Sequence, residues 1–238
     1  LTQIEPLKQN AQPLVEYLDN PDLKAGFNTS SSIHFNSYKQ LKDQRFFFYV
    51  SADQGKKSIN NSVRYNLDEG TQQIAYVNID KDNWRMYGGG SFSFVLQKKW
   101  GLKMNLGMGA QYNSQFSYLS SFNEDPKLNR NQTWSVTPGI GFSRYKANKM
   151  DFYMSLNPGV EQMNSYLQPE LNRTTFKFRT YSEITYYLPK DFKISLSTDQ
   201  NYQAATKTLQ SINLINMNGY ISKKFLKDKS LEAQVFVN

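Results

Sequence analysis

Hydrophobic and polar residues alternate along most of this chain, most clearly between Trp134 and Glu161. Alternate positions carry large apolar side chains, while the positions between them carry small or polar ones. Successive side chains of a β-strand leave opposite faces of the sheet, so a period of two predicts strands. A polar turn expected at Lys146–Lys149 divides the stretch into a hairpin over 132–166. Each strand is longer than the usual five or six residues of a globular strand.

The same alternation predicts further strands on either side of this hairpin, about ten in all. They are expected at 25–39, 45–65, 74–96, 101–118, 174–188, 191–203 and 210–225, with a last strand starting at 231. The lead-in at 1–24 is expected to be irregular because Pro6, Pro13 and Pro21 interrupt it. A short helical turn is expected within 12–24. Residues 25–238 would form the sheet.

The predicted connections alternate between short and long. Short turns fall near 42, 99, 147, 190 and 228, and longer polar loops, including one at 120–131, fall near 68, 125, 169 and 206. All short turns would therefore lie on one rim of the sheet. Short periplasmic turns and longer extracellular loops are typical of outer-membrane barrels, which predicts an all-β fold, an antiparallel transmembrane β-barrel.

The alternation also assigns side chains to the two faces of this barrel wall. The residues expected to face lipid are Leu102, Met104, Leu106, Met108, Trp134, Val136, Ile140, Phe142, Phe152, Met154 and Leu156. The polar residues expected to face the lumen are Arg85, Lys103, Asp151, Glu161, Lys177, Arg179, Glu183 and Asp199. Charge is costly on a lipid face, so the charged side chains should line the wet interior and pair across strands. Aromatic girdles are expected at the strand ends, from Trp84, Trp100, Tyr112, Trp134, Tyr166, Tyr186, Tyr187 and Phe192.

Composition is compatible with this assignment. Mean hydropathy is −0.66, as expected when half of each strand faces water, and no apolar run reaches the roughly 18 residues of a membrane helix. The net charge is +8, but the basic residues are scattered and form no stripe, which disfavours a nucleic-acid partner. The chain has no cysteine, so neither a disulfide framework nor a thiolate metal site is available. The N-terminal residues have no apolar signal segment, so a removed signal or a piece of a longer chain is expected.

No pattern indicates catalytic, metal-binding or cofactor-binding residues, and the chain is not expected to be an enzyme. His34 is the only histidine, so it has neither a partner ligand nor a nucleophile arrangement, and it is expected to be a lumen residue. Gly88, Gly89 and Gly90 have no Lys-Ser/Thr after them and are not a phosphate loop. Glycines within a strand permit curvature or the close approach of another backbone.

Three stretches resemble the C-terminal barrel segments of TonB-dependent receptors of the Bacteroidota outer-membrane β-barrel family. NPDLKAGFNTSSSIHFNSY (20–38) is similar to the NPxLKPE stretch before the last strands, although Ala25-Gly26 replace Pro-Glu. Residues 134–203 and 211–238 resemble the segments that follow, including SYLQPELNRT and YYLPKDFKISLS. The resemblance implies a Gram-negative outer-membrane barrel of about 22 strands, of which this chain would supply the C-terminal half.

The resemblance further implies a plug domain, energy relayed by TonB and import of a nutrient ligand by the full-length protein. Outer-membrane lipid would be a partner, and a surface lipoprotein would be another. Alternatives stay open: a passive or structural outer-membrane barrel, or a soluble all-β binding domain such as a sandwich. The sandwich predicts that Phe142, Phe152, Met154 and Leu156 lie in a protein core. An enzyme is the least favoured, because no convergent polar constellation is visible.

Overall fold

The computed structural model describes residues 14–66, 68–146, 149–207, 209–225 and 230–237. The strands are β1 (Val15–Leu18), β2 (Phe27–Lys39), β3 (Gln44–Lys56), β4 (Ile59–Asn66), β5 (Thr71–Asn78), β6 (Asn83–Gln97), β7 (Leu102–Ser121), β8 (Lys127–Lys146), β9 (Met150–Ser165), β10 (Arg173–Leu188), β11 (Phe192–Gln203), β12 (Ile212–Phe225) and β13 (Leu231–Val237). Short 3-10 turns are η1 (Gln40–Lys42), η2 (Pro169–Leu171) and η3 (Pro189–Asp191). The described part contains no α-helix, so the all-β prediction is confirmed.

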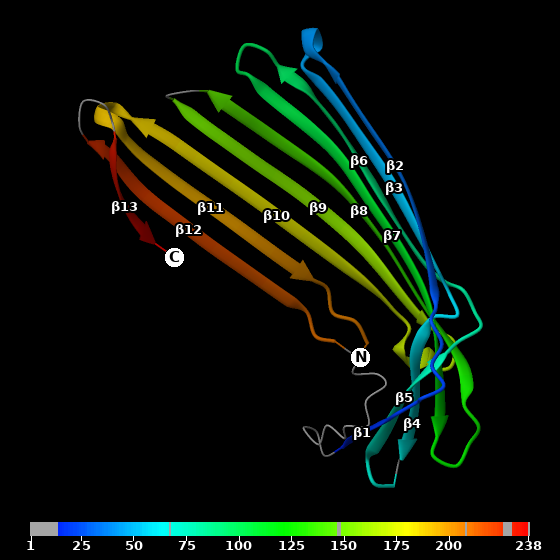
Figure 1. Ribbon diagram of the computed structural model, residues 1–238. Coiled ribbons are helices and arrows are strands. Elements are labelled where there is room, and N and C mark those ends of the chain that lie inside the picture. The colour runs from blue at the N-terminus through cyan, green and yellow to red at the C-terminus, as the bar shows by residue number, and fades with distance from the viewer. Residues whose placement is uncertain (1–13, 67, 147–148, 208, 226–229, 238) are drawn as a thin grey trace.

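The strands form one sheet of 13 strands. Its main body runs β2-β3-β6-β7-β8-β9-β10-β11-β12-β13, and every pair of neighbours in it is antiparallel. Figure 1 shows this body as a single curved layer, with β2 and β13 at its two sides. Neither β2 nor β13 has a second strand partner among the described residues, so the sheet is not closed here.

Two predicted long strands are each divided in the structure. The strand expected at 45–65 breaks after Lys56 into β3 and β4, and the one expected at 74–96 breaks into β5 and β6. Lys57 has a φ of 49°, which turns the chain out of the main ladder. The β4–β5 hairpin therefore leaves the body of the sheet, and β4 pairs in parallel with the end of β7, from Ser62↔Tyr118 to Tyr65↔Ser121.

The lead-in also differs from the prediction. Where a helical turn was expected, β1 pairs in parallel with β5, from Val15↔Gln72 to Leu18↔Ala75. The following segment is tied to β5 by Asn78, whose side chain donates to the Lys24 carbonyl at 2.7 Å and accepts from the Lys24 N–H at 2.7 Å. The edge of β5 offers backbone N–H and C=O groups to a further strand. Pairing with this edge gives the segment an extended conformation, which its own proline-rich sequence does not predict. Residues 1–13 lie outside the described part.

The connections are sorted between the two rims as predicted. In Figure 1, η1, the β6–β7 turn and η3 lie at the upper rim, which we call the short-turn rim, and so do the ends of β8 and β12 and the starts of β9 and β13. The β4–β5 hairpin and the β7–β8, β9–β10 and β11–β12 connections lie at the opposite, long-loop rim. The centres of the short connections near 147 and 228 fall outside the described residues. The loop expected at 120–131 is shorter, because β8 already begins at Lys127.

The sheet has no second layer packed against it in the described part of the chain. Ile79 is the one buried hydrophobic side chain there. Phe142, Phe152 and Met154 are half-buried, which contradicts the sandwich alternative. Among the described residues, no helix is long and apolar enough to cross a membrane.

Candidate functional site

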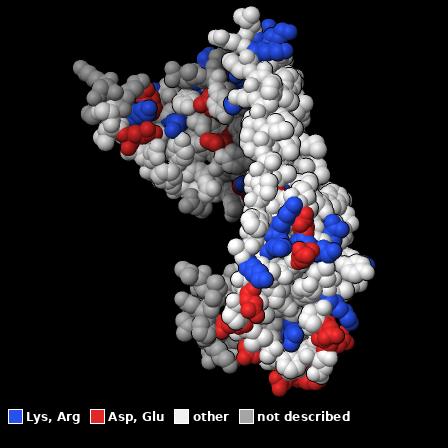
Figure 2. Space-filling model, turned by 45° about the vertical axis from the view of Figure 1, so that its right-hand side comes forward, with Lys and Arg blue, Asp and Glu red and all other residues white. Residues whose placement is uncertain are grey.

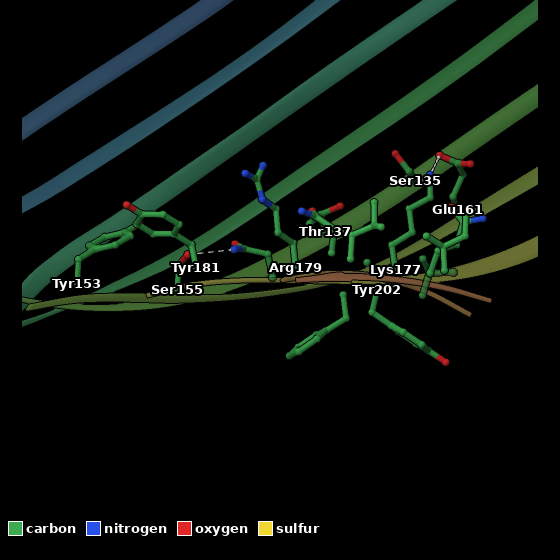
Figure 3. Close-up of a pocket in the computed structure, with 17 residues that line it drawn as sticks. Ser135, Thr137, Tyr153, Ser155, Glu161, Lys177, Arg179, Tyr181 and Tyr202 are labelled. Carbon is green, nitrogen blue, oxygen red and sulfur yellow. Dashed lines mark hydrogen bonds and ion pairs between the residues drawn. The ribbon is translucent and has the colours of Figure 1, made fainter. Parts of the chain in front are cut away.

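The concave face of the sheet carries the polar side chains. Directly paired residues of an antiparallel ladder lie on the same face, so the register extends the alternation of each strand across the whole sheet. Figure 3 shows Ser135, Lys177 and Arg179 on the side toward which the other strands curve, and Tyr202 on the opposite side. An open hollow of about 860 Å³ lies over β8 to β12. Polar side chains of this concave face line it, together with the apolar Ile212 and Leu214 of β12.

Two ion pairs cross the floor of this hollow. Lys177 Nζ on β10 lies 2.8 Å from Glu161 Oε2 on β9. Arg179 on β10 lies 2.6 Å from Asp199 Oδ2 on β11, and Asn201 donates to the other Asp199 oxygen at 2.6 Å. Four residues predicted to line a lumen are thus brought together as neighbouring pairs of opposite sign.

The carboxylates Asp151 and Glu183 accept hydrogen bonds from tyrosines on the same face. Tyr187 donates to Asp151 at 2.9 Å, from β10 to β9. Tyr181 donates to Glu183 at 2.8 Å within β10. The sequence predicted Tyr187 in an aromatic girdle, and this prediction is wrong. The odd position of Tyr187 in β10 places its side chain on the concave face, away from the apolar face.

Lys103 reaches a residue that lies outside the strands. Its ammonium lies 2.6 Å from Asp43 Oδ2, at the end of η1. The pair joins the β2–β3 turn to β7 across β3 and β6. The hydrogen bond from Lys103 holds the pKa of the Asp43 carboxyl below its usual range.

Arg85 is placed apart from these pairs. It lines a second hollow of about 330 Å³ on the concave face of β3, β6 and β7, together with Tyr49 and Gln111. Asp53 on β3 is the register partner of Arg85, but no carboxylate forms an ion pair with Arg85 in the described part of the chain. His34 lies beside this hollow on β2, and its ring stacks with that of Tyr49 with centroids 6.3 Å apart.

Gly89 leaves room for the Tyr49 ring next to this hollow. It is paired with Tyr49 on one side and with Gly109 on the other. A Cβ atom on Gly89 would approach the Met108 carbonyl to 2.9 Å and the Tyr49 ring to 3.1 Å. The glycine run therefore serves a close approach within the sheet, and no helix follows it.

The convex face carries the apolar side chains. The register places on it all of the residues expected to face lipid; for example, Leu106 pairs with Ile140, which pairs with Leu156. Many side chains of this face are exposed, including Met108 at 57% and Met217 at 61%. Figure 2 shows a broad uncharged stretch between Lys and Arg side chains at the upper end and mixed charges in the lower half.

The charged residues of the convex face are all basic and lie toward the ends of their strands. In the described part of the main sheet these are Lys39, Lys56, Arg130, Arg144 and Lys223. No Asp or Glu of these strands has its side chain on that face. The concave face, by contrast, carries charges of both signs.

Sequence reasoning missed several residues that hold these surfaces. Asp43 lies in a turn and its partner is distant in sequence. Arg130 was assigned to a loop, because the polar run before Trp134 hides the early start of β8. Asn129 is buried and accepts from the Leu167 N–H at 2.8 Å, fixing the β9–β10 loop. The described residues contain no group of His, Cys, Asp or Glu that could hold a metal ion.

Comparisons with protein-family models, with curated proteins and with solved structures found no match to this chain.

Proposed function

We propose that this chain is part of the β-barrel wall of a TonB-dependent receptor that imports a nutrient ligand across a Gram-negative outer membrane. The observation that carries the proposal is the contrast between the two faces of one curved sheet. The convex face is apolar and exposed, whereas the concave face is polar and charged. A wall between lipid and an aqueous lumen requires this arrangement.

The dimensions of the apolar band support a membrane position. On β8, Arg130 and Arg144 share the convex face, with Gln132, Trp134, Val136, Pro138, Ile140 and Phe142 between them. A rise of roughly 3.3 Å per residue gives about 46 Å along the strand, and a tilt of about 45° reduces this to about 33 Å. That span is close to the roughly 30 Å of a hydrocarbon core.

The free edges of β2 and β13 support further strands in the complete wall. Lipid cannot hydrogen-bond to unpaired backbone groups, so an open edge within a bilayer is unfavourable. The proposal therefore includes strands that pair with these edges and close the barrel.

The import function, the plug and the TonB partner rest on the resemblance of 20–38, 134–203 and 211–238 to TonB-dependent receptors.

The native polypeptide that carries this chain tests the proposal. We expect an antibody against the chain to detect it in the outer-membrane fraction, at a mass several times the 27.6 kDa of this chain. Crosslinking in living cells should join it to TonB. A membrane protein without a TonB adduct would indicate a passive barrel, and a polypeptide absent from the membrane fraction would overturn the proposal.

A further inference from the structure

The convex face contains an apolar hollow of about 750 Å³ over β3, β6, β7 and β8. Its floor is formed by Gly88, Gly90 and Ala110. Larger side chains, among them Phe48 and Met108, stand around this floor. An apolar depression of this size lies within the range of ligand-binding cavities.

The register explains why the hollow forms there. Gly88 lies between Val50 and Ala110, and Gly90 lies between Phe48 and Met108. Two glycines on β6 therefore leave a furrow between the larger side chains of β3 and β7. A Cβ atom on either glycine would approach a β3 carbonyl oxygen to 3.0 Å. Close packing of β6 against β3 therefore favours glycine at both positions, and no side chain fills the furrow there.

A cation lies at the end of the hollow nearest the long-loop rim. Tyr112 and Trp134 line this end. The Arg130 guanidinium lies 3.4 Å from the Tyr112 hydroxyl and 3.1 Å from Ser114 Oγ. Gln132 donates to the same Tyr112 hydroxyl at 2.7 Å. No carboxylate forms an ion pair with Arg130 in the part of the chain that the structure describes.

We propose that this hollow and Arg130 form a binding site for a lipid with an anionic phosphate head group. One acyl chain would fill the furrow over Gly88, Gly90 and Ala110, and the phosphate would accept hydrogen bonds from Arg130. Charge complementarity selects this occupant, because an apolar furrow that ends at an exposed arginine, on a face without acidic side chains, matches a chain joined to an anion. The inference rests on the proposed position of the convex face in lipid.

Trp134 reports directly on occupancy, because its ring lines the hollow and bromine on an acyl chain quenches indole fluorescence on contact. The native polypeptide that carries this chain is reconstituted in phosphatidylcholine bilayers with a small fraction of brominated phosphatidylglycerol or brominated phosphatidylcholine. The Trp134 signal is the difference between the protein and its Trp134→Phe variant. We expect brominated phosphatidylglycerol to quench at an about fivefold lower fraction, as expected for one arginine near an anionic head group.

Matched variants separate the two parts of the site. Arg130→Gln should remove the preference for phosphatidylglycerol, whereas Lys127→Gln, on the same strand but the other face, should retain it. Ala110→Leu should fill the furrow and reduce quenching by either lipid, whereas Ala233→Leu, exposed on the convex face of β13, should not. Equal quenching by the two lipids would overturn the lipid site. Quenching by neither lipid would overturn the proposed membrane position itself.

Discussion

Arg130 and Arg144 lie on the same face of β8, and no charged residue lies on that face between them. Both side chains are long enough to extend their charged groups away from an apolar band toward its borders. Arg144 is paired with Leu102 and Phe152, so it enters the apolar face near the short-turn rim. Arg130 does the same at the long-loop rim. In the proposed membrane position, the polar head groups of the two leaflets would lie at these two levels.

A charge placed between these two arginines should be costly. Leu106→Lys puts an ammonium near the middle of the convex band and should destabilise the protein in bilayers by about 2–4 kcal/mol. Asn105→Lys, one position away on the concave face, should change stability by less than about 0.5 kcal/mol. Urea titration of the two variants in bilayers measures the difference. Equal costs would contradict the assignment of the faces.

Gly89 should be the least replaceable glycine of the concave face. Gly89→Ala brings a Cβ atom to 2.9 Å from a backbone oxygen and should destabilise by about 1–3 kcal/mol. Gly107→Ala is the control, because its nearest contacts would lie at 3.8 Å, and it should be neutral or slightly stabilising. The same urea titration compares the two. If Gly89→Ala were also neutral, close packing would not explain this glycine.

Asn129 should hold the β9–β10 loop against β8. Asn129→Ala leaves the Leu167 N–H without its acceptor and removes the contact with Ser165, in which the amide donates to the hydroxyl at 3.0 Å. Loss of a buried partner costs about 1–3 kcal/mol. Hydrogen exchange at Leu167 should become roughly tenfold faster or more. Asn123→Ala, in the exposed β7–β8 loop, should leave that rate unchanged, and an unchanged rate in Asn129→Ala would contradict this role.

The Asp43–Lys103 pair should make a small, pH-dependent contribution to stability. The folded pKa of Asp43 lies below its usual value, so the stabilisation is fully present above the unfolded pKa, near 4. It is lost as the pH falls through the lower, folded pKa. Both side chains are about 40% exposed, so the contribution should stay below about 1 kcal/mol.

The difference in unfolding free energy between the protein and Asp43→Asn measures this contribution. It should be constant from pH 5 to pH 7 and should shrink below about pH 4. It should also shrink in high salt, because exposed pairs are screened. A difference that increased on acidification would contradict the pairing.

The alternation of residues such as Leu102–Tyr112 predicted most strands of the main sheet, the shared faces of β7 to β9 and the sorting of short and long connections. The break at Lys57 was not predicted, although the apolar positions change from even numbers in Phe46–Ala52 to odd numbers in Ile59–Tyr65; a single positive φ redirects the chain there. The alternation also missed β1, whose pairing with β5 depends on an available strand edge. The sequence predicted that charged side chains of the polar face would form ion pairs across strands. It could not predict which residues pair, such as Glu161 with Lys177, because the partners depend on the register between strands.

Cysteine scanning along β7 tests the proposed wall most directly, because this chain has no cysteine of its own and the unsubstituted polypeptide gives the background labelling. Single cysteines at Leu102 to Tyr112 are introduced into the native polypeptide and treated in intact outer membranes with a lipid-soluble or a water-soluble maleimide. We predict that even positions react with the lipid-soluble reagent and odd positions with the water-soluble one. Uniform reaction with the water-soluble reagent at all positions would contradict a wall between lipid and water.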